Sequence, residues 1–387
     1  MDHVVKRPRA ALVLVVASTV LGLLGTDLVL PAVPSLPETL GGGPAEAQFV
    51  LAAYVGGTAV GLLVFGALGD RFATRTLLIA SLLLTAIVSS ACAMAPTIWS
   101  LIALRAVQGA VASGPAVFAP AIVRAMFDQA QAIRAMGALG SIESLAPALA
   151  PILGAGLLSL GGWYLSFQLI GAIALMLAAA NFAFPLIPQT SRRPCGSYPT
   201  LLSDPVFLRY ALSQAFVLGG LLVFVFGAPA VLVRSFGGTL TDFILMQVIG
   251  IPSFIMAANV AGSLATKFGP ERMLSVGTAL ASAGAVPMLA YAMSGGTSAM
   301  AVTALFVPVN IGLGLRGPPG FYRAVLAARG DDARGSAIVI LAIMAATATG
   351  TAVVAPFIEH GLVPLALGTL ALELAALACL ILLPRLP

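Results

Sequence analysis

A single carboxylate interrupts the first long apolar run of the chain, which extends from about residue 10 to residue 36. Asp27 stands in the stretch LLGTDLVLP (23–31), whose other residues are almost all apolar. If this run crosses a lipid bilayer, a charge there costs roughly 2.5–3.5 kcal/mol. We therefore interpret Asp27 as a candidate proton-binding site. The alternative is a structural Asp that caps a helix break before Pro31 and Pro34.

Arg105 is a second charged residue inside an apolar run. It lies roughly 10 Å into the run that begins at residue 98, counted at 1.5 Å per residue. Its guanidinium group does not lose its proton in proteins. We expect Arg105 either to hold a positive charge beside an acidic proton site or to extend its side chain to the outer membrane interface.

Glu143 is a second acid within an apolar run, one helical turn before Pro147. Two roles stay open for it, a further protonation site or a structural partner of Arg124 or Arg134. Prolines bend helices and free backbone carbonyls, which suits the lining of a cavity. The residues we expect around a substrate cavity are Thr26, Tyr54, Pro147, Pro151 and Phe224.

Two more charged residues fall inside runs of the second half of the chain. Arg316 stands near the inner end of its run, so we expect its side chain to extend towards the cytoplasmic interface. Glu373 stands in the last run, where it faces either a neighbouring helix or the lipid.

Composition indicates what kind of fold must position these residues. Of 387 residues, 60% are hydrophobic and 9% are charged, against about a quarter charged in a soluble domain. A soluble protein of this length cannot hide so much apolar surface. A spanning helix needs about 20 apolar residues. Twelve such runs lie at roughly 10–36, 46–68, 76–95, 98–123, 133–160, 163–187, 207–233, 241–265, 273–293, 297–321, 335–358 and 362–384.

A polar stretch separates the twelve runs into two groups of six. We predict an N-terminal six-helix half over 1–188, a cytoplasmic linker over 189–206 and a C-terminal six-helix half over 207–387. The predicted class is an all-α polytopic membrane protein with two pseudo-symmetric halves. The sequence has no phosphate-binding loop, catalytic triad spacing or metal-ligand spacing. We therefore expect neither an enzyme nor a protein with a cofactor or metal.

The basic residues predict the orientation in the membrane. Sixteen of the 19 lysines and arginines fall in segments on the same side as the N-terminus. Arg234 falls in a loop on the other side, and Arg105 and Arg316 fall inside runs. The positive-inside rule then places both termini in the cytoplasm. The net charge of +5 reflects this topology and does not indicate nucleic acid binding.

A short motif recurs after the second run of each half. GALGDRFATRT (66–76) and GSLATKFGPER (262–272) share a glycine, a leucine, a cation and a phenylalanine at matching positions. A duplicated six-span unit explains both copies. A chance match of one Gly-rich turn is the alternative.

The first copy of the motif carries charges that could gate access. Asp70 beside Arg71 and Arg75 can join helix ends on the cytoplasmic side, and Gly66 permits a close backbone approach. We predict that this loop closes one conformation and opens in another. An interfacial charge cluster that only sets topology is the alternative.

GALGDRFATRT (66–76) resembles the loop between helices two and three of the major facilitator superfamily, G-x-L-a-D-R-x-G-R-R. Ala73 and Thr74 depart from that pattern. LIALRAVQGAVASG (101–114) resembles the R-x-x-Q-G pattern in helix four of proton-antiporting members. The resemblance implies twelve spans and a proton-coupling role for Arg105.

Three further segments resemble one subgroup, the bicyclomycin and chloramphenicol resistance type of drug:proton antiporter. They are GTDLVLPAVPSL (25–36), SLAPALAPILGAG (144–156) and FVFGAPAVLV (224–233). Together the resemblances cover most of both halves. They imply proton coupling at Asp27, whereas no role carries over to Glu143, where the subgroup usually has an apolar residue.

The resemblance implies a monomer in the bacterial inner membrane, surrounded by lipid, that exports small lipophilic drugs such as phenicols in exchange for protons. A metabolite exporter or uniporter of the same fold, for sugars or amino acids, is the alternative. A membrane receptor without transport is a third hypothesis. The internal repeat and the intramembrane charges speak against it, because a passive bundle needs neither.

Overall fold

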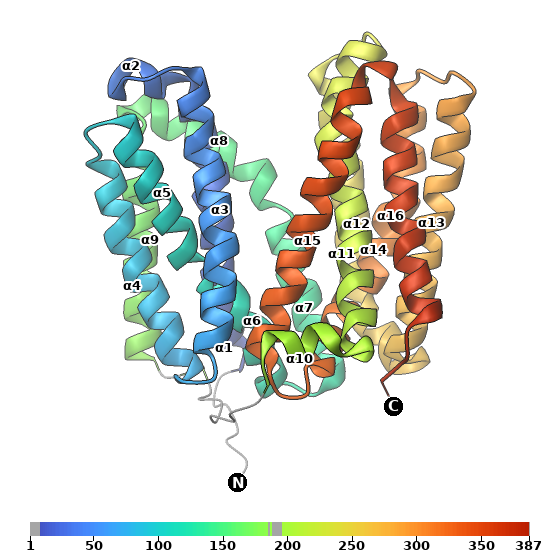
Figure 1. Cartoon of the computed structure of the whole chain (residues 1–387), viewed down its shortest axis with the longest axis horizontal. Coiled ribbons are helices and arrows are strands. Elements are labelled where there is room, and N and C mark those ends of the chain that lie inside the picture. Colours follow the sequence, from blue (N-terminus) through green and yellow to red (C-terminus); the bar gives the residue numbers. More distant parts are fainter. Residues whose placement is uncertain (1–7, 185, 188–195, 387) are drawn as a thin grey trace. The chain divides into compact units, whose positions relative to one another are not determined.

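The computed structural model describes residues 8–184, 186–187 and 196–386, and these residues form helices joined by short turns (Figure 1). No strand occurs in this part of the chain. Hydrocarbon offers no partner for backbone N–H and C=O groups, so a chain this apolar must bond them within helices. Eleven helices of the described residues are long and apolar enough to cross a membrane.

The helices belong to two compact units. The first comprises Met1–Met126, Ile142–Cys195 and Gly330–Ala337, and the second comprises Phe127–Ser141, Gly196–Arg329 and Ile338–Pro387. The predicted division into halves at 1–188 and 207–387 stays a prediction. Residues 189–195 of the predicted linker 189–206, including Cys195, lie outside the described residues.

The helices of the first unit are α1 (Pro8–Asp27), the 3-10 helix Leu30–Ser35, α2 (Leu36–Leu40), α3 (Pro44–Leu68), α4 (Thr74–Ala93), α5 (Ile98–Ala112), α6 (Gly114–Met126), α8 (Ala146–Gly161) and α9 (Tyr164–Ala183). The second unit holds α10 (Tyr198–Ser203), α11 (Pro205–Ala230), the π-helix Val231–Ser235, α12 (Leu240–Phe268), α13 (Pro270–Met293), α14 (Ala299–Ala327), the 3-10 helix Ala355–His360 and α16 (Leu362–Leu382). Two helices, α7 (Gln129–Glu143) and α15 (Asp332–Val354), have residues in both units.

Several helices begin where the sequence supplies a capping side chain. Thr97, Ser197, Asp204 and Ser298 precede α5, α10, α11 and α14, and each side-chain oxygen accepts a bond from a first-turn N–H. Such caps satisfy donors that have no partner within the helix.

The predicted fifth span, 133–160, is not one continuous helix. α7 ends at Glu143, and α8 begins at Ala146 with a proline in its first turn. Proline fits the start of a helix because it lacks the N–H that an interior position would need. The apolar part of α8, Leu149–Gly161, is shorter than the eleven spanning helices. The run is therefore present as two pieces, and its break follows Glu143 directly.

Glycines bring α3 and α5 into close contact in the first unit. A Cβ atom on Gly57 would lie 1.9 Å from the carbonyl oxygen of Ala106, and one on Gly109 would lie 2.0 Å from that of Tyr54. Small residues let membrane helices approach in this way. This contact fixes the position of Tyr54 against the helix that carries Arg105.

The two ends of α13 test the predicted orientation. Ser275 near its start and Ser294 just after its end are both exposed. In intact cells, a cysteine at Ser294 should react with a membrane-impermeant thiol reagent added outside, whereas a cysteine at Ser275 should react only after the cells are opened. Native Cys195 should also stay unlabelled from outside. Outside labelling of Cys195 or of Ser275→Cys would reverse the orientation.

Candidate functional site

Asp27 is the last residue of α1, and the helix ends there because a proline-containing 3-10 helix follows. The residue is half-buried. Its side chain makes no hydrogen bond or ion pair with any described residue. In this structure Asp27 therefore makes none of the hydrogen bonds that a structural, helix-capping role would require.

Tyr54 on α3 lies between α1 and Arg105. Its hydroxyl donates a hydrogen bond of 2.6 Å to the carbonyl oxygen of Gly22 on α1. The Arg105 guanidinium carbon stands 4.2 Å from the centre of the Tyr54 ring, the distance of a cation–π contact. The phenol is within electrostatic reach of both Arg105 and Asp27. A side chain at Gly25 would collide with the Tyr54 hydroxyl, since a Cβ atom there would lie 2.2 Å from it.

Arg105 does not extend to the membrane interface, because its side chain is 0% exposed. Its Nε donates to the carbonyl oxygen of Val50 at 3.2 Å, and Nη1 donates to Gln108 Oε1 at 2.6 Å. Gln108 in turn donates from Nε2 to Ser89 Oγ at 2.7 Å. Nη2 has no hydrogen-bond partner among the described residues. Neutral acceptors therefore hold the Arg105 guanidinium group in place, and its Nη2 atom is still available as a donor.

Glu143 faces α1 and not the arginines considered for it. Its carboxyl group interacts with the side chain of Thr19, which is buried and whose hydroxyl donates to the carbonyl oxygen of Val16 at 2.9 Å. Thr19 and Asp27 are eight residues apart on one helix, or about 12 Å at 1.5 Å per residue. Two carboxyl groups are thus associated with α1. Asp27 is its last residue, and Glu143 of α7 lies beside it.

The two arginines considered as partners of Glu143 have other neighbours. Arg124 forms an ion pair of 2.6 Å with Asp332. Arg134 packs against Gly262 of α12, where a Cβ atom would lie 2.3 Å from Arg134 Cγ.

The loop after α3 is tied to the start of α15, within the first unit. Asp70 accepts a hydrogen bond from Arg334, whose Nη1 also donates to Asp331 Oδ2 at 2.9 Å. A Cβ atom on Gly69 would lie 2.6 Å from the side chain of Ala333, so the glycine allows this approach. Burial raises the pKa of Asp331, and its bond to Arg334 opposes that shift. One guanidinium group therefore serves two carboxylates.

Sequence reasoning singled out Asp70 but not its partner. The signal was present in GDDARG (330–335), which places two acids and an arginine at the start of a helix. Spacing alone does not show that these residues meet a loop more than 250 positions earlier in the chain.

The other predicted gate residues have different surroundings. Arg75 donates from Nε and Nη2 to the carbonyl oxygen of Asn181, at 3.1 and 2.8 Å, and from Nη2 to that of Phe182 at 2.9 Å. It thereby caps the end of α9, where the last carbonyls lack partners. Arg71 is exposed, and Gly66 is buried.

The predicted cavity residues outside this group are scattered. Phe224 is 1% exposed and stacks on Phe306 with ring centres 4.7 Å apart, within the core of the second unit. Pro147 is exposed, whereas Thr26 and Pro151 are half-buried. The role of these four residues in a substrate cavity stays a prediction.

Arg316 differs from the expectation that it extends to the interface. It is 0% exposed, and its Nη1 donates to the carbonyl oxygen of Ser213 at 2.8 Å. Glu373 is also fully buried and interacts electrostatically with Arg316. Neither oxygen of the Glu373 carboxyl group has a hydrogen-bond partner among the described residues.

A sequence profile of the Major Facilitator Superfamily matches residues 15–383. The chain belongs to the major facilitator superfamily. It is therefore a multi-pass membrane transporter of small molecules and not an enzyme. This confirms the predicted family and the predicted all-helical fold.

Relatives within the superfamily include drug-resistance proteins. A bicyclomycin resistance protein homolog of Haemophilus influenzae is 26% identical over 266 residues, which cover 66% of each chain. A chloramphenicol resistance protein of Pseudomonas aeruginosa is 30% identical over 272 residues, covering 69% of this chain and 64% of that protein. The chain thus aligns with about two thirds of the length of each relative.

A superfamily member of known structure has the same fold. The proton:xylose symporter XylE superposes with a TM-score of 0.76 and covers 99% of this chain and 97% of its own. The two sequences are 14% identical, so this likeness shows the fold alone.

Arg334 is shared between Asp70 and Asp331, and this arrangement leads to a specific prediction for thermal stability. Arg334→Gln should lower the melting temperature more than Asp70→Asn, because it leaves Asp70 and Asp331 together without a cation. We expect a loss of about 1–2 kcal/mol for Arg334→Gln, since the pair is partly open to solvent and screened. Thermal unfolding in detergent measures it.

A double variant separates pairing from a general loss of charge. Asp70→Asn should be destabilising alone but stabilising in the Arg334→Gln background, where it removes repulsion between two acids. Arg71→Gln is the matched control and should leave the melting temperature unchanged, because Arg71 is exposed. Additive effects of Asp70→Asn and Arg334→Gln would exclude the shared bond.

Proposed function

We propose that this transporter is an antiporter that exports small lipophilic drugs from the bacterial cytoplasm in exchange for protons. The names of two relatives refer to bicyclomycin and chloramphenicol resistance, which supports this substrate class. Phenicol-like compounds are therefore the first substrates to test. We place the protein in the inner membrane as a monomer, with both termini in the cytoplasm.

Asp27 is the group that we propose to bind the coupling proton, and its lack of any partner carries this proposal. A half-buried carboxylate without a donor or a cation has lost part of its hydration without compensation. Protonation removes that charge at no cost in hydrogen bonds. A group in this setting exchanges a proton readily when its exposure or its charged neighbours change.

Arg105 supplies the positive charge that we propose to act on this proton exchange. Its bonds go to Val50 and Gln108, which are neutral acceptors, so its charge is not cancelled by an acid. A conformation that brings this cation closer to Asp27 favours the ionised form of the carboxyl group. A change in the distance between them would then release or take up the proton.

Coupling requires that proton and drug oppose one another. If protonation of Asp27 weakens drug binding, drug binding must weaken proton binding by the same factor. The protonated form then releases drug outside, and the deprotonated form takes up drug inside. Glu143, against Thr19 of the same helix, is the candidate for a second proton.

The bond between Asp70 and Arg334 supports a gating role for the loop after α3. α15 begins in the first unit, where Arg334 lies, and continues in the second. A rearrangement that moves α15 away from the loop must break this bond. Its strength would thus set the balance between two conformations.

A metabolite exporter or uniporter of the same fold is the alternative function. Sugars and amino acids need several fixed polar partners. The predicted cavity residues Thr26, Tyr54, Pro147, Pro151 and Phe224 offer few such groups, which favours lipophilic drugs. Growth of an efflux-deficient bacterium on a panel of drugs would discriminate the two, because a metabolite carrier should change no drug tolerance.

Asp27→Asn tests the proton site, because it keeps the size of the side chain and removes titration. In vesicles with an imposed pH gradient, we expect uphill drug transport to disappear while drug binding persists. Native affinity should fall as the pH drops, since the protonated form releases drug, and the variant should lose most of this dependence. Drug uptake and equilibrium binding across a pH series measure both effects.

Glu38→Gln is the matched control, since Glu38 is an exposed acid on α2 of the same unit. It should leave transport and its pH dependence unchanged. Uphill export by Asp27→Asn with native pH dependence would move the coupling site elsewhere, and Glu143→Gln would be the next variant to measure.

Asp70→Asn tests the gate. It should reduce the transport rate more than drug affinity, because Asp70 lies in the loop after α3 and, as we propose, acts on the balance of conformations. The initial rate of efflux and the dissociation constant in detergent give the two quantities. A parallel fall of rate and affinity would contradict gating.

A further inference from the structure

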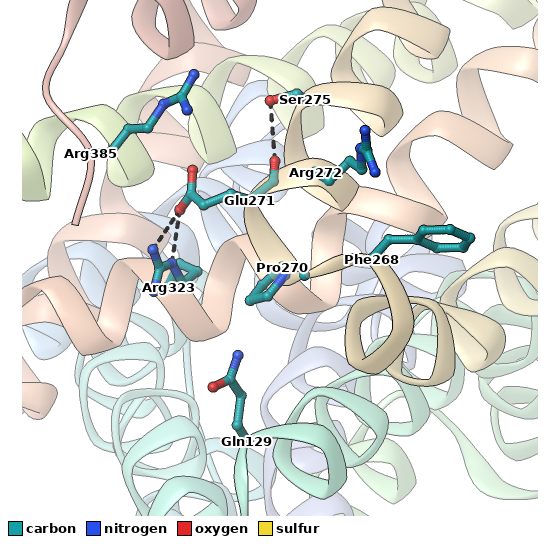
Figure 2. A pocket seen from close by; sticks show the side chains of 9 residues that line it. Gln129, Phe268, Pro270, Glu271, Arg272, Ser275, Arg323 and Arg385 are labelled. Carbon is teal, nitrogen blue, oxygen red and sulfur yellow. Dashed lines mark hydrogen bonds and ion pairs between the residues drawn. The ribbon is translucent and has the colours of Figure 1, made fainter. Parts of the chain in front are cut away.

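A pocket of about 500 Å³ lies at the junction of α12 and α13 in the second unit (Figure 2). The junction is tight, because Gly269 adopts a φ of 85° between the two helices. The pocket is lined by Gln129, Phe268, Gly269, Pro270, Glu271, Arg272, Ser275, Arg323 and Arg385. None of these residues takes part in the proposed proton or drug site.

The charges that line the pocket do not balance. Three arginines face one acid, Glu271. That acid is already engaged, since its carboxylate accepts from Arg323 Nε at 2.8 Å and from the hydroxyl of Tyr210 at 2.6 Å. The buried Arg209 adds a further cation 3.6 Å from the same carboxylate. Glu271 therefore cannot neutralise the remaining arginines.

Arg272 and Arg385 carry the surplus positive charge. Both side chains are exposed, and neither forms a hydrogen bond or ion pair with any described residue. Figure 2 shows them on either side of Glu271, while the dashed lines from the Glu271 carboxylate lead to Arg323. An anion between them would meet two free guanidinium groups.

The start of α13 adds to this positive potential. Arg272 stands in the first turn of the helix, where a cation opposes the helix dipole and is unfavourable. The first-turn N–H groups of a helix also lack partners within it. A bound anion would neutralise the cation at the start of the helix and could accept hydrogen bonds from the first-turn N–H groups.

The position of the pocket indicates that the anion belongs to a lipid. The pocket lies where two membrane-spanning helices end, on the side that the basic residues assign to the cytoplasm. Phe268 in its wall is 43% exposed, which offers apolar contact beside the charged groups. Basic pockets at this level between spanning helices suit lipid head groups.

We propose that this pocket binds the phosphate of an anionic phospholipid of the inner leaflet, held by Arg272 and Arg385. Guanidinium groups match phosphate oxygens in pairs of parallel hydrogen bonds. Arg323 remains bonded to Glu271. The site is independent of the proposed drug and proton exchange.

Binding of phosphatidylglycerol to the purified full-length protein tests this site. Arg272→Gln and Arg385→Gln should each weaken binding by about fivefold, the effect of one arginine near an anionic lipid surface. Phosphatidylcholine, whose head group has no net charge, should bind less well than phosphatidylglycerol to the native protein. Native mass spectrometry or a fluorescent phosphatidylglycerol gives the affinities.

Arg234→Gln is the matched control, since Arg234 is an exposed arginine of the same unit, outside the pocket. It should leave phosphatidylglycerol binding unchanged, and melting temperatures verify that all variants are folded. Equal losses in the control and the pocket variants would overturn the proposal, as would equal binding of the two lipids. Displacement of phosphatidylglycerol by millimolar inorganic phosphate would assign the pocket to a free anion and would contradict the proposal of a lipid ligand.

Discussion

The absence of water from the bilayer core is the constraint on which the rest of this structure depends. A charged or polar group in that region must find its partner within the protein. Three arginines of the spanning helices, Arg105, Arg209 and Arg316, are buried to 1% exposure or less. Each donates to main-chain carbonyl oxygens elsewhere in the chain, Arg105 at Val50, Arg209 at Leu380 and Leu383, and Arg316 at Ser213. Main-chain carbonyl oxygens thus serve as acceptors for all three buried cations, and Arg209 also pairs with Glu271.

The intramembrane acids Asp27, Glu143 and Glu373 form no ion pair with any described residue, although Glu373 interacts electrostatically with Arg316. Asp27 and Glu373 form no hydrogen bond through their carboxyl groups within the described chain, and Glu143 faces only the hydroxyl of Thr19. At the ends of the spanning helices the pattern is the opposite. There Asp332 pairs with Arg124, and Glu271 pairs with Arg323. The acids within the spanning helices and the acids that pair at helix ends thus have different surroundings, which suits the proton coupling proposed above.

Close contact of helices is the second condition for this arrangement. Gly57 and Gly109 bring α3 against α5, so that the ring of Tyr54 covers the guanidinium group of Arg105. In the second unit Gly277 and Gly312 bring α13 against α14 in the same manner, each with a Cβ position within 2.7 Å of the other's carbonyl oxygen. Without a hydrophobic force between helices in lipid, such packing supplies much of the attraction.

The sequence by itself determined the class and all spans but the fifth, and it singled out Asp27, Arg105 and Asp70, because length, apolarity and charge are local properties. The orientation stays a prediction from the basic residues. Tertiary structure decided what surrounds those residues. It broke the fifth span after Glu143, buried Arg105 instead of leaving it at the interface, and joined Asp70 to Arg334. These outcomes depend on which helix faces which, and that is set by contacts between residues far apart in the chain, which no local pattern records.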